Sequence, residues 1–310
     1  MLWAVLADFR KLGSVHTLTT LDCRIDLQHR ELPADEVFTV EPDQREQVFT
    51  AMLERCDAAL IIAPETDGNL ARLSQIVEDR GIPLLGSFAA AVKIAGDKGS
   101  CYRLFTQAGI PTPLTVVTSN ALVRQAAANF GFPLVTKPLD GVGSVGVCLI
   151  DNPADLDRAV DILQRQTGHM EILLQKFVPG IHASVSLLAS GDNILPLSLN
   201  GQQMEIGCPF TYKGGLIPLK HPLQARAFEN AAKAVHLIPG LQGYVGVDMI
   251  LDEQEAWVIE VNPRITTSYI GLRQVLGMNL AGMIYRASID GVLPESVQLT
   301  GQVYFAKNDL

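Results

Sequence analysis

The sequence has no excess of positive charge. Its 24 Lys and Arg residues are outnumbered by 33 Asp and Glu residues, which gives a formal net charge of −9 at pH 7. We find no basic stripe, and an acidic chain of this kind is poorly suited to the phosphate backbone of nucleic acids. We therefore predict no nucleic-acid partner.

Long apolar runs are also missing. No stretch approaches the roughly 20 residues that a membrane-spanning helix needs, so we predict no membrane contact. The first residues are apolar, but they lack a basic segment and reach Asp8 too early for a signal peptide. These absences favour a cytoplasmic location.

Cysteine is scarce and irregularly spaced. The chain has 5 cysteines, an odd number, and none of them forms a Cys-x-x-Cys pair. This spacing argues against both a zinc site and a disulfide framework. We expect buried free thiols in a reducing cytoplasm at all of these positions, which are Cys23, Cys56, Cys101, Cys148 and Cys208.

The chain is long enough to bury a large core. It has 310 residues, of which 48% are hydrophobic and 18% are charged. This size and composition predict two or three folded domains without a long disordered tract. We divide the chain into residues 1–95, 96–172 and 173–310.

The N-terminal part alternates between strand-like and helix-like segments. Short apolar runs at Leu2–Leu6, Ala58–Ile62 and Pro83–Leu85 are strand candidates. Between them, Leu70–Asp79 has the apolar spacing of a helix. Such alternation predicts a small α/β unit, in which helices flank a parallel sheet.

The rest of the chain reads as mixed strands and helices. Residues 96–110 lead into a helix that ends at Gly109. The predicted strands are Leu134–Lys137, Val145–Ile150, Ile172–Val178, Ala183–Ala189 and Ile194–Leu199, and the predicted helices are Ala121–Phe130, Asp155–Gln166, 224–237 and 270–287.

Two apolar strands near the C-terminus carry polar residues. Asp248 lies on the first, and Glu260, Asn262 and Arg264 alternate along the second, so the last three share one face. Two carboxylates and an amide oxygen suit Mg²⁺, which usually serves a bound nucleotide. The forked cation of Arg264 can bind phosphate or carboxylate.

The acidic turn Asp252–Glu255 joins these strands and predicts a hairpin. Asp248 can stand opposite Glu260 only if the hairpin has an odd-numbered loop or a bulge. The neighbouring register would turn Asp248 to the other face and separate the two acids. We predict the first register. The alternative is an amphipathic hairpin with a solvated acidic face.

A glycine loop precedes the hairpin in the chain. Gly141, Gly143 and Gly146 match the dinucleotide pattern Gly-x-Gly-x-x-Gly, but the residues that follow have strand composition, and the pattern requires a helix there. The loop is therefore predicted to join two antiparallel strands and to cover phosphates with its backbone N–H groups. An ordinary glycine-rich hairpin is the alternative.

Two lysines accompany this loop. Lys137 ends an apolar strand four residues before the loop, and Lys98 lies at the first domain junction. Each lysine taken alone is typical of a surface position. Together with the loop and the acidic hairpin, they indicate phosphate binding.

In order, the chain shows a junction lysine, Lys-Pro before a glycine hairpin, a hinge-like strand and the sequence Asp…Glu-x-Asn-Pro-Arg. This set resembles the ATP-grasp superfamily over essentially the whole chain. The resemblance implies an α/β Rossmann-like N-terminal domain followed by an α+β ATP-grasp fold, whose two subdomains clasp ATP.

The resemblance also assigns ligands to residues. It implies ATP contacts by Lys98, Lys137, Gly141, Gly143, Ser144, Gly146, Gln175, Lys176, Phe177, Val178 and His182. It implies Mg²⁺, as two ions with Mn²⁺ as a substitute, on Asp248, Glu260 and Asn262. Gln175 stands where the family usually has an acid, and His182 stands where it usually has a ribose-binding Glu. His182 is interpreted as a ribose donor or as an ordinary strand residue.

Three segments, Ala63–Asp67, Tyr212–Gly215 and Asn262–Tyr269, resemble the branch that includes tyramine–glutamate ligase, an enzyme of methanofuran-type cofactor biosynthesis. This implies that ATP activates a carboxylate, such as that of glutamate, as an acyl phosphate that an aromatic or other amine attacks. Arg264 and Lys137 would be catalytic. The implied contacts to these small-molecule substrates are Glu65, Lys213, Gly214, Arg264, Thr267 and Ser268.

Several of these assignments have simpler alternatives. Glu65, the expected ammonium anchor, can cap the following helix. Lys213 and Gly214 can form a plain turn, and helix capping can explain Thr267 or Ser268. For the whole chain, the alternatives are a D-alanine–D-alanine-type ligase, a non-catalytic ATP-binding protein and a nicotinamide oxidoreductase. A homodimer is a further expectation.

Overall fold

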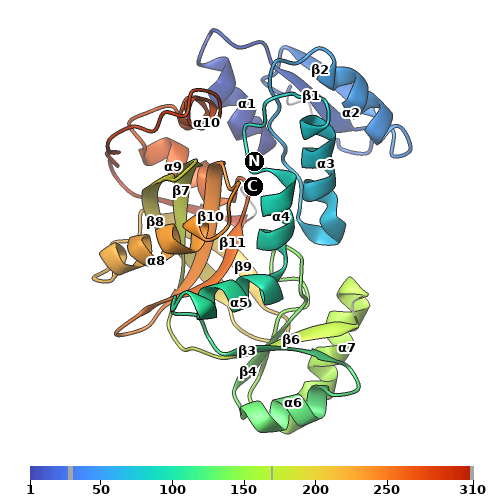
Figure 1. The fold of residues 1–310 in the computed structure, drawn as a ribbon, viewed down its shortest axis with the longest axis vertical. Coiled ribbons are helices and arrows are strands. Elements are labelled where there is room, and N and C mark those ends of the chain that lie inside the picture. Colours follow the sequence, from blue (N-terminus) through green and yellow to red (C-terminus); the bar gives the residue numbers. More distant parts are fainter. Residues whose placement is uncertain (27–30, 169, 308–310) are drawn as a thin grey trace.

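Three β-sheets organise the chain, and the largest lies between the other two (Figure 1). The computed structural model describes residues 1–26, 31–168 and 170–307. In these ranges the sheets have two, six and four strands. None of the helices described there combines the length and apolar character needed to cross a bilayer.

The N-terminal sheet is short and parallel. β1 (Leu18–Asp22) pairs with β2 (Glu36–Val40). The helices that follow are α2 (Arg45–Leu53), α3 (Asn69–Glu78) and α4 (Ala89–Gly96). The helix predicted at Leu70–Asp79 is confirmed as α3. The strands predicted at Ala58–Ile62 and Pro83–Leu85 are wrong as full strands, because these segments meet only in one parallel bridge between Ala59 and Leu84.

The first segment is a helix, so the strand predicted at Leu2–Leu6 is wrong. α1 (Leu2–Arg10) buries Val5 and Phe9, one turn apart, against the C-terminal part of the chain. Asp8 of this helix forms an ion pair with Arg273 at 2.5 Å. A short apolar run cannot by itself distinguish a strand from a buried helix, and the packing partner decides between them here.

The four-stranded sheet is antiparallel, in the order β3-β6-β4-β5. Its elements, reached through α5 (Lys98–Gln107), are β3 (Thr115–Ser119), α6 (Val123–Phe130), β4 (Leu134–Lys137), β5 (Cys148–Ile150), α7 (Leu156–Thr167) and β6 (Glu171–Lys176). Both α6 and α7 pack on the sheet through a core that includes Ala127 and Leu163. The boundary that we placed after residue 172 falls inside β6.

The six-stranded sheet runs in the order β11-β10-β7-β8-β9-β12. Its strands are β7 (Ile181–Ser190), β8 (Asn193–Glu205), β9 (Thr211–Ile217), β10 (Gly243–Leu251), β11 (Ala256–Asn262) and β12 (Val303–Ala306). α8 (Gln224–His236) covers one face of the sheet, whereas α9 (Ser268–Val275) and α10 (Leu280–Ile289) cover the other (Figure 1).

The single helix predicted at 270–287 is divided into α9 and α10. The side chain of Asn279 accepts a hydrogen bond from the backbone N–H of Gly282 at 3.0 Å and so begins a new helix.

The C-terminal hairpin has the predicted register. Asp248 on β10 pairs directly with Glu260 on β11, and Gly246 pairs with Asn262. The register shifts between Asp248 and Met249, which is the bulge that this pairing requires. The two acids are therefore brought to one place by local hairpin geometry.

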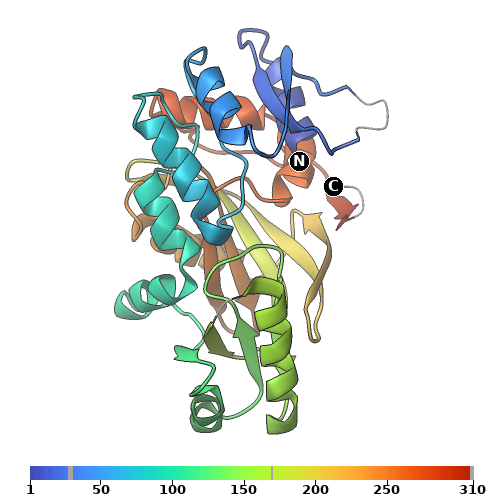
Figure 2. The ribbon, with the colours of Figure 1, turned by 90° about the vertical axis from the view of Figure 1, so that its right-hand side faces the viewer.

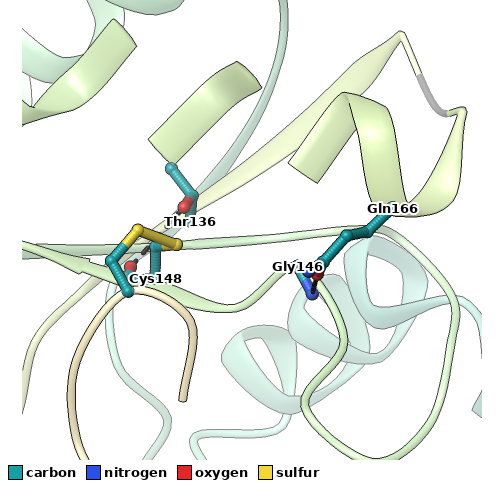
Figure 3. Close-up of a disulfide and its surroundings, with 5 residues drawn as sticks. Thr136, Gly146, Cys148 and Gln166 are labelled. Atoms are coloured by element: carbon teal, nitrogen blue, oxygen red, sulfur yellow. Dashed lines mark hydrogen bonds between the residues drawn. A yellow bond between two sulfur atoms is a disulfide. The ribbon is translucent and has the colours of Figure 1, made fainter. Parts of the chain in front are cut away.

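The expectation of five buried free thiols is correct only for Cys101. Cys148 and Cys208 form a disulfide (Figure 3), Cys23 is exposed and Cys56 is half-buried. Cys148 lies on β5, and Cys208 lies in the loop between β8 and β9. Backbone hydrogen bonds hold this loop against β5, from Leu149 N–H to the Gly207 oxygen at 2.9 Å and from Phe210 N–H to the Val147 oxygen at 2.7 Å. The disulfide thus joins the two larger sheets, and it weakens the argument for a reducing cytoplasm.

Reduction of this disulfide is expected to lower the free energy of unfolding by about 2–4 kcal/mol, because it releases a loop closed across a sequence separation of 60 residues. Urea unfolding with and without a thiol reductant measures the effect. Substituting both partners by Ser should abolish the response to reductant. Cys23→Ser is the control, since Cys23 is exposed and free. Equal stability of the oxidised and reduced protein would contradict the prediction.

Candidate active site

A cavity of about 310 Å³ lies between the four-stranded and six-stranded sheets. Figure 2 shows the green loop after β4 extending from the smaller sheet toward the larger one. Most residues selected from the sequence line this cavity, namely Lys98, Lys137, Gly141, Gly143, Ser144, Gln175, Lys176, Phe177, Val178, His182, Asp248, Glu260, Asn262, Arg264, Thr267 and Ser268. Residues from distant segments therefore converge on one site.

The paired carboxylates lie on the larger sheet. Asn262 donates from Nδ2 to Asp248 Oδ2 at 3.2 Å, beside Glu260. Burial and the negative charge of Glu260 raise the pKa of Asp248 to about 7. Burial would also raise the pKa of Glu260, but the ammonium groups of Lys98 and Lys137 lower it. Two adjoining carboxylates and an amide form a donor set that fits a hard divalent cation. A bound cation would displace the proton that Asp248 holds below about pH 7.

Two lysines face these carboxylates. Lys98 Nζ lies 3.2 Å from Glu260 Oε2 and donates to the Gly141 carbonyl oxygen at 3.2 Å. Lys137 Nζ donates to Gln175 Oε1 at 2.7 Å, and burial lowers the pKa of Lys137 to about 8. Positive groups beside a potential cation site suit a ligand that is itself strongly negative, such as a triphosphate.

The glycine loop joins antiparallel strands β4 and β5, as predicted. Gly143, Ser144 and Gly146 have φ values of 69°, 63° and 71°, in the left-handed region that favours glycine. Gly146 does not line the cavity. Its N–H donates to Gln166 Oε1 of α7 at 2.8 Å (Figure 3), so it holds the end of the loop in place.

The two departures from the family pattern have structural explanations. Gln175 is buried, accepts from Lys137 and donates from Nε2 to Thr115 Oγ1 at 3.0 Å, a pair of roles that a carboxylate cannot fill. His182 packs edge to face with Phe210, with ring centroids 6.2 Å apart. Burial and the nearby Lys137 charge lower the pKa of His182 to about 4, so its ring is neutral at pH 7.

We expect this histidine to make stability pH-dependent. The folded state binds fewer protons than the unfolded state between the folded pKa of about 4 and the ordinary value of 6.5. Stability should therefore fall by about 2 kcal/mol from pH 7 to pH 5 on account of this group. Urea titrations at both pH values measure the difference, and His182→Gln should remove that part of it. His236→Gln, at the exposed end of α8, is the control. If the free energy of unfolding of His182→Gln changes between pH 7 and pH 5 as much as that of the wild type, the prediction is wrong.

Arg264 and Glu65 are paired with each other. Arg264 Nε lies 2.8 Å from Glu65 Oε2, and the two side chains are only 15% and 6% exposed. The expected ammonium anchor is thus already engaged through one oxygen. The other, Oε1, is buried without a hydrogen-bond partner among the described residues.

Thr267 and Ser268 lie at the entrance to α9. Thr267 Oγ1 donates to the Tyr212 hydroxyl at 3.4 Å, and the Ser268 and Ser184 hydroxyls are 3.4 Å apart. Thr267 occupies the N-cap position but makes no side-chain capping bond. Capping therefore does not account for Thr267.

Lys213 and Gly214 are not among the residues that line the cavity. Lys213 Nζ forms an ion pair with Glu205 at 2.6 Å. A Cβ atom on Gly214 would lie 2.2 Å from the Phe305 carbonyl oxygen, so this glycine allows β12 to approach β9. Their substrate roles stay predictions that the geometry does not support.

The structure adds residues that sequence reasoning missed. Gln202 on β8 donates from Nε2 to Asp248 Oδ1 at 2.8 Å. Phe210, Tyr212 and Lys307 also line the cavity. No regular spacing in the sequence marks these residues, because the strand order of the six-stranded sheet brings each of them to the cavity. Tyr212 stood out only as part of a distinctive segment.

Comparisons with known proteins agree with this geometry. A family model described as an ATP-grasp domain matches residues 95–268, and one described as a pre-ATP-grasp domain matches residues 15–92. The tyramine–L-glutamate ligase of Methanocaldococcus fervens is 36% identical over 71% of this chain and 62% of its own length. The D-alanine–D-alanine ligase of Ectopseudomonas mendocina is 26% identical over 80% of each chain.

Solved structures show the same fold at lower identity. An L-amino acid ligase from Bacillus licheniformis superposes with a TM-score of 0.74 at 18% identity, over 93% of this chain and 71% of its own. A biotin carboxylase from Campylobacter jejuni gives 0.80 at 19%, over 96% and 71%. The chain spans about six tenths of the length of the tyramine–glutamate ligases that it matches. The matched domain covers more than half of the chain and the site has the expected geometry, so this chain belongs to the ATP-grasp family.

Proposed function

We propose that this protein is an ATP-dependent carboxylate–amine ligase. The γ-phosphoryl group of ATP passes to a substrate carboxylate oxygen and ADP leaves. The amine lone pair then attacks the acyl carbon, inorganic phosphate leaves, and the amine nitrogen loses a proton. The observation that carries the proposal is the meeting of Asp248, Glu260 and Asn262 with Lys98 and Lys137 in one cavity under a glycine loop.

The chain's own groups supply positioning and charge. Lys98 and Lys137 would hold phosphate oxygens, and the loop N–H groups would cover them. Backbone groups of residues 175–178 would meet the adenine edge. Arg264 would bind the transferring phosphoryl group or the substrate carboxylate through its fork.

Asp248, Glu260 and Asn262 would hold Mg²⁺, as two ions, with Mn²⁺ as a substitute. The carboxylates fit this role because they adjoin each other, and because burial and the charge of Glu260 raise the pKa of Asp248 to about 7, a repulsion that a cation would relieve. Bound there, the metal would offset the negative charge of the phosphates.

The proposed substrates are glutamate and an aromatic amine. The tyramine–L-glutamate ligases at 36% and 34% identity support this choice. A D-alanine–D-alanine-type ligase is the second candidate, because such enzymes match 80% of both chains at lower identity. The two candidates share the ATP site and differ in the substrate end of the cavity.

A phosphate-release screen tests the proposal. Purified protein with ATP and Mg²⁺ receives glutamate with tyramine, glutamate with tyrosine, or D-alanine alone. The two mixed pairs are also tested with one member omitted. ADP and phosphate should appear only when both substrates of the correct pair are present. AMP and pyrophosphate as products would defeat the acyl-phosphate scheme. Tight ATP binding without turnover on any pair would favour a non-catalytic protein.

A further inference from the structure

One loop of the N-terminal part touches both halves of the ATP site. In residues 64–68, Glu65 Oε2 accepts from Arg264 Nε at 2.8 Å, and the Asp67 N–H donates to Asp140 Oδ2 at 3.1 Å. Arg264 follows β11 of the larger sheet, whereas Asp140 begins the glycine loop of the smaller one. The loop therefore spans the edge of the cleft.

The Glu65–Arg264 pair is poorly explained as a device for stability. Both side chains are nearly buried, so each charge has lost most of its hydration. Glu65 Oε1 is also left without a hydrogen bond among the described residues. A buried ion pair with an unsatisfied oxygen is at best neutral for folding when compared with apolar packing.

The contacts of Arg264 show what the pair achieves. Its Nε is held by Glu65, and its Nη1 donates to the Ile265 carbonyl oxygen at 3.1 Å. Within the part of the chain that the structure describes, Nη2 makes no hydrogen bond. Two of the three guanidinium nitrogens are thus fixed by protein groups, and the side chain lines the cavity. A guanidinium held at two points can bind an anion with little further loss of side-chain entropy.

We propose that Glu65 is a positioning residue, which orients Arg264 toward the reacting anion and makes turnover depend on contact with the N-terminal loop. The inference rests on the proposed ligase function. It replaces the sequence-based expectation that Glu65 contacts the substrate ammonium itself. Because Glu65 acts only through Arg264, its removal should matter only while Arg264 is present.

A double-mutant cycle in kcat tests this proposal. Glu65→Ala should lower kcat about 100-fold, as expected for a misplaced catalytic group, with KM for ATP changed less than about twofold. The double variant Glu65→Ala/Arg264→Ala should be no slower than Arg264→Ala. Glu65→Gln should restore part of kcat, because its amide oxygen can still accept from Nε. If the alanine variants fold poorly, Glu65→Met and Arg264→Met provide the same cycle, because methionine fills much of the same space and cannot replace the hydrogen bond between the two side chains.

Asp8→Ala is the matched control. It breaks another buried ion pair between the N-terminal and C-terminal parts, with Arg273, away from the cavity. It should lower thermal stability but leave kcat unchanged at temperatures where it is folded. The inference is overturned if Glu65→Ala leaves kcat unchanged. It is also overturned if adding Glu65→Ala to the Arg264→Ala protein lowers kcat by as large a factor as it does in the wild type. A wild-type protein that releases no phosphate with any substrate pair contradicts the proposed function instead.

Discussion

Replacing Glu260 with Gln is expected to lower the rate of ADP and phosphate release by at least about 1,000-fold. Glu260 supplies one of two adjoining carboxylates, and an amide would neither neutralise a bound divalent cation nor compete with water for it. A loss of about 4 kcal/mol of transition-state charge stabilisation corresponds to this factor. Initial rates with saturating ATP and Mg²⁺ measure it.

The fold should survive this change. Glu260 lies 3.2 Å from Lys98 Nζ, so the substitution removes the negative charge that faces this lysine, but it also removes the repulsion that raises the pKa of Asp248. These effects oppose each other, and we expect the free energy of unfolding to change by less than about 2 kcal/mol. Glu253→Gln, in the exposed turn of the same hairpin, is the matched control and should keep full activity. A fully active Glu260→Gln would refute the metal role.

The family resemblance brought together residues from distant segments, but the residues alone predicted only the part of the site that local geometry builds. Asp248 and Glu260 belong to one hairpin, where a period of two and a short turn leave two registers, and only one brings the acids together. The position of the glycine loop between two antiparallel strands was likewise predictable, because β5 begins soon after it and the residues there have strand composition. In both cases the deciding contacts lie within about 15 residues in the chain.

Individual contacts between distant segments were not predictable from the spacing of residues in the sequence. Glu65 and Arg264 are 199 residues apart, and Cys148 and Cys208 are 60 apart. Neither pair has a spacing signal, since each depends on how two sheets or domains approach each other. The same reason explains α1, whose apolar residues fit a strand or a helix until the C-terminal helices supply the surface that they cover.

Lys137→Met is expected to slow turnover about 100-fold and to weaken ATP–Mg²⁺ binding, while the protein becomes more stable. Methionine has a similar volume but no charge, so the variant loses the ammonium that would hold phosphate oxygens. Burial lowers the pKa of Lys137 to about 8, so holding the charged ammonium at pH 7 lowers the free energy of unfolding. Removing that charge should raise the free energy of unfolding by about 1–2 kcal/mol, after the lost hydrogen bond to Gln175 is subtracted.

The same pKa gives the wild type a distinctive pH dependence. The ammonium form predominates in the free protein below about pH 8 and is lost above it, so the apparent Kd for ATP–Mg²⁺ should rise about tenfold by about pH 9. Lys137→Met should bind weakly at every pH and lack this rise. Lys233→Met, on the exposed side of α8 where Lys233 pairs with Glu229, is the control and should keep the wild-type profile. Calorimetric titrations across this pH range measure the affinities. A lysine with only a structural role would change stability without changing how the apparent Kd depends on pH. A Lys137→Met protein whose Kd still rises with pH as in the wild type would therefore show that another group titrates, and it would exclude Lys137 from the phosphate site.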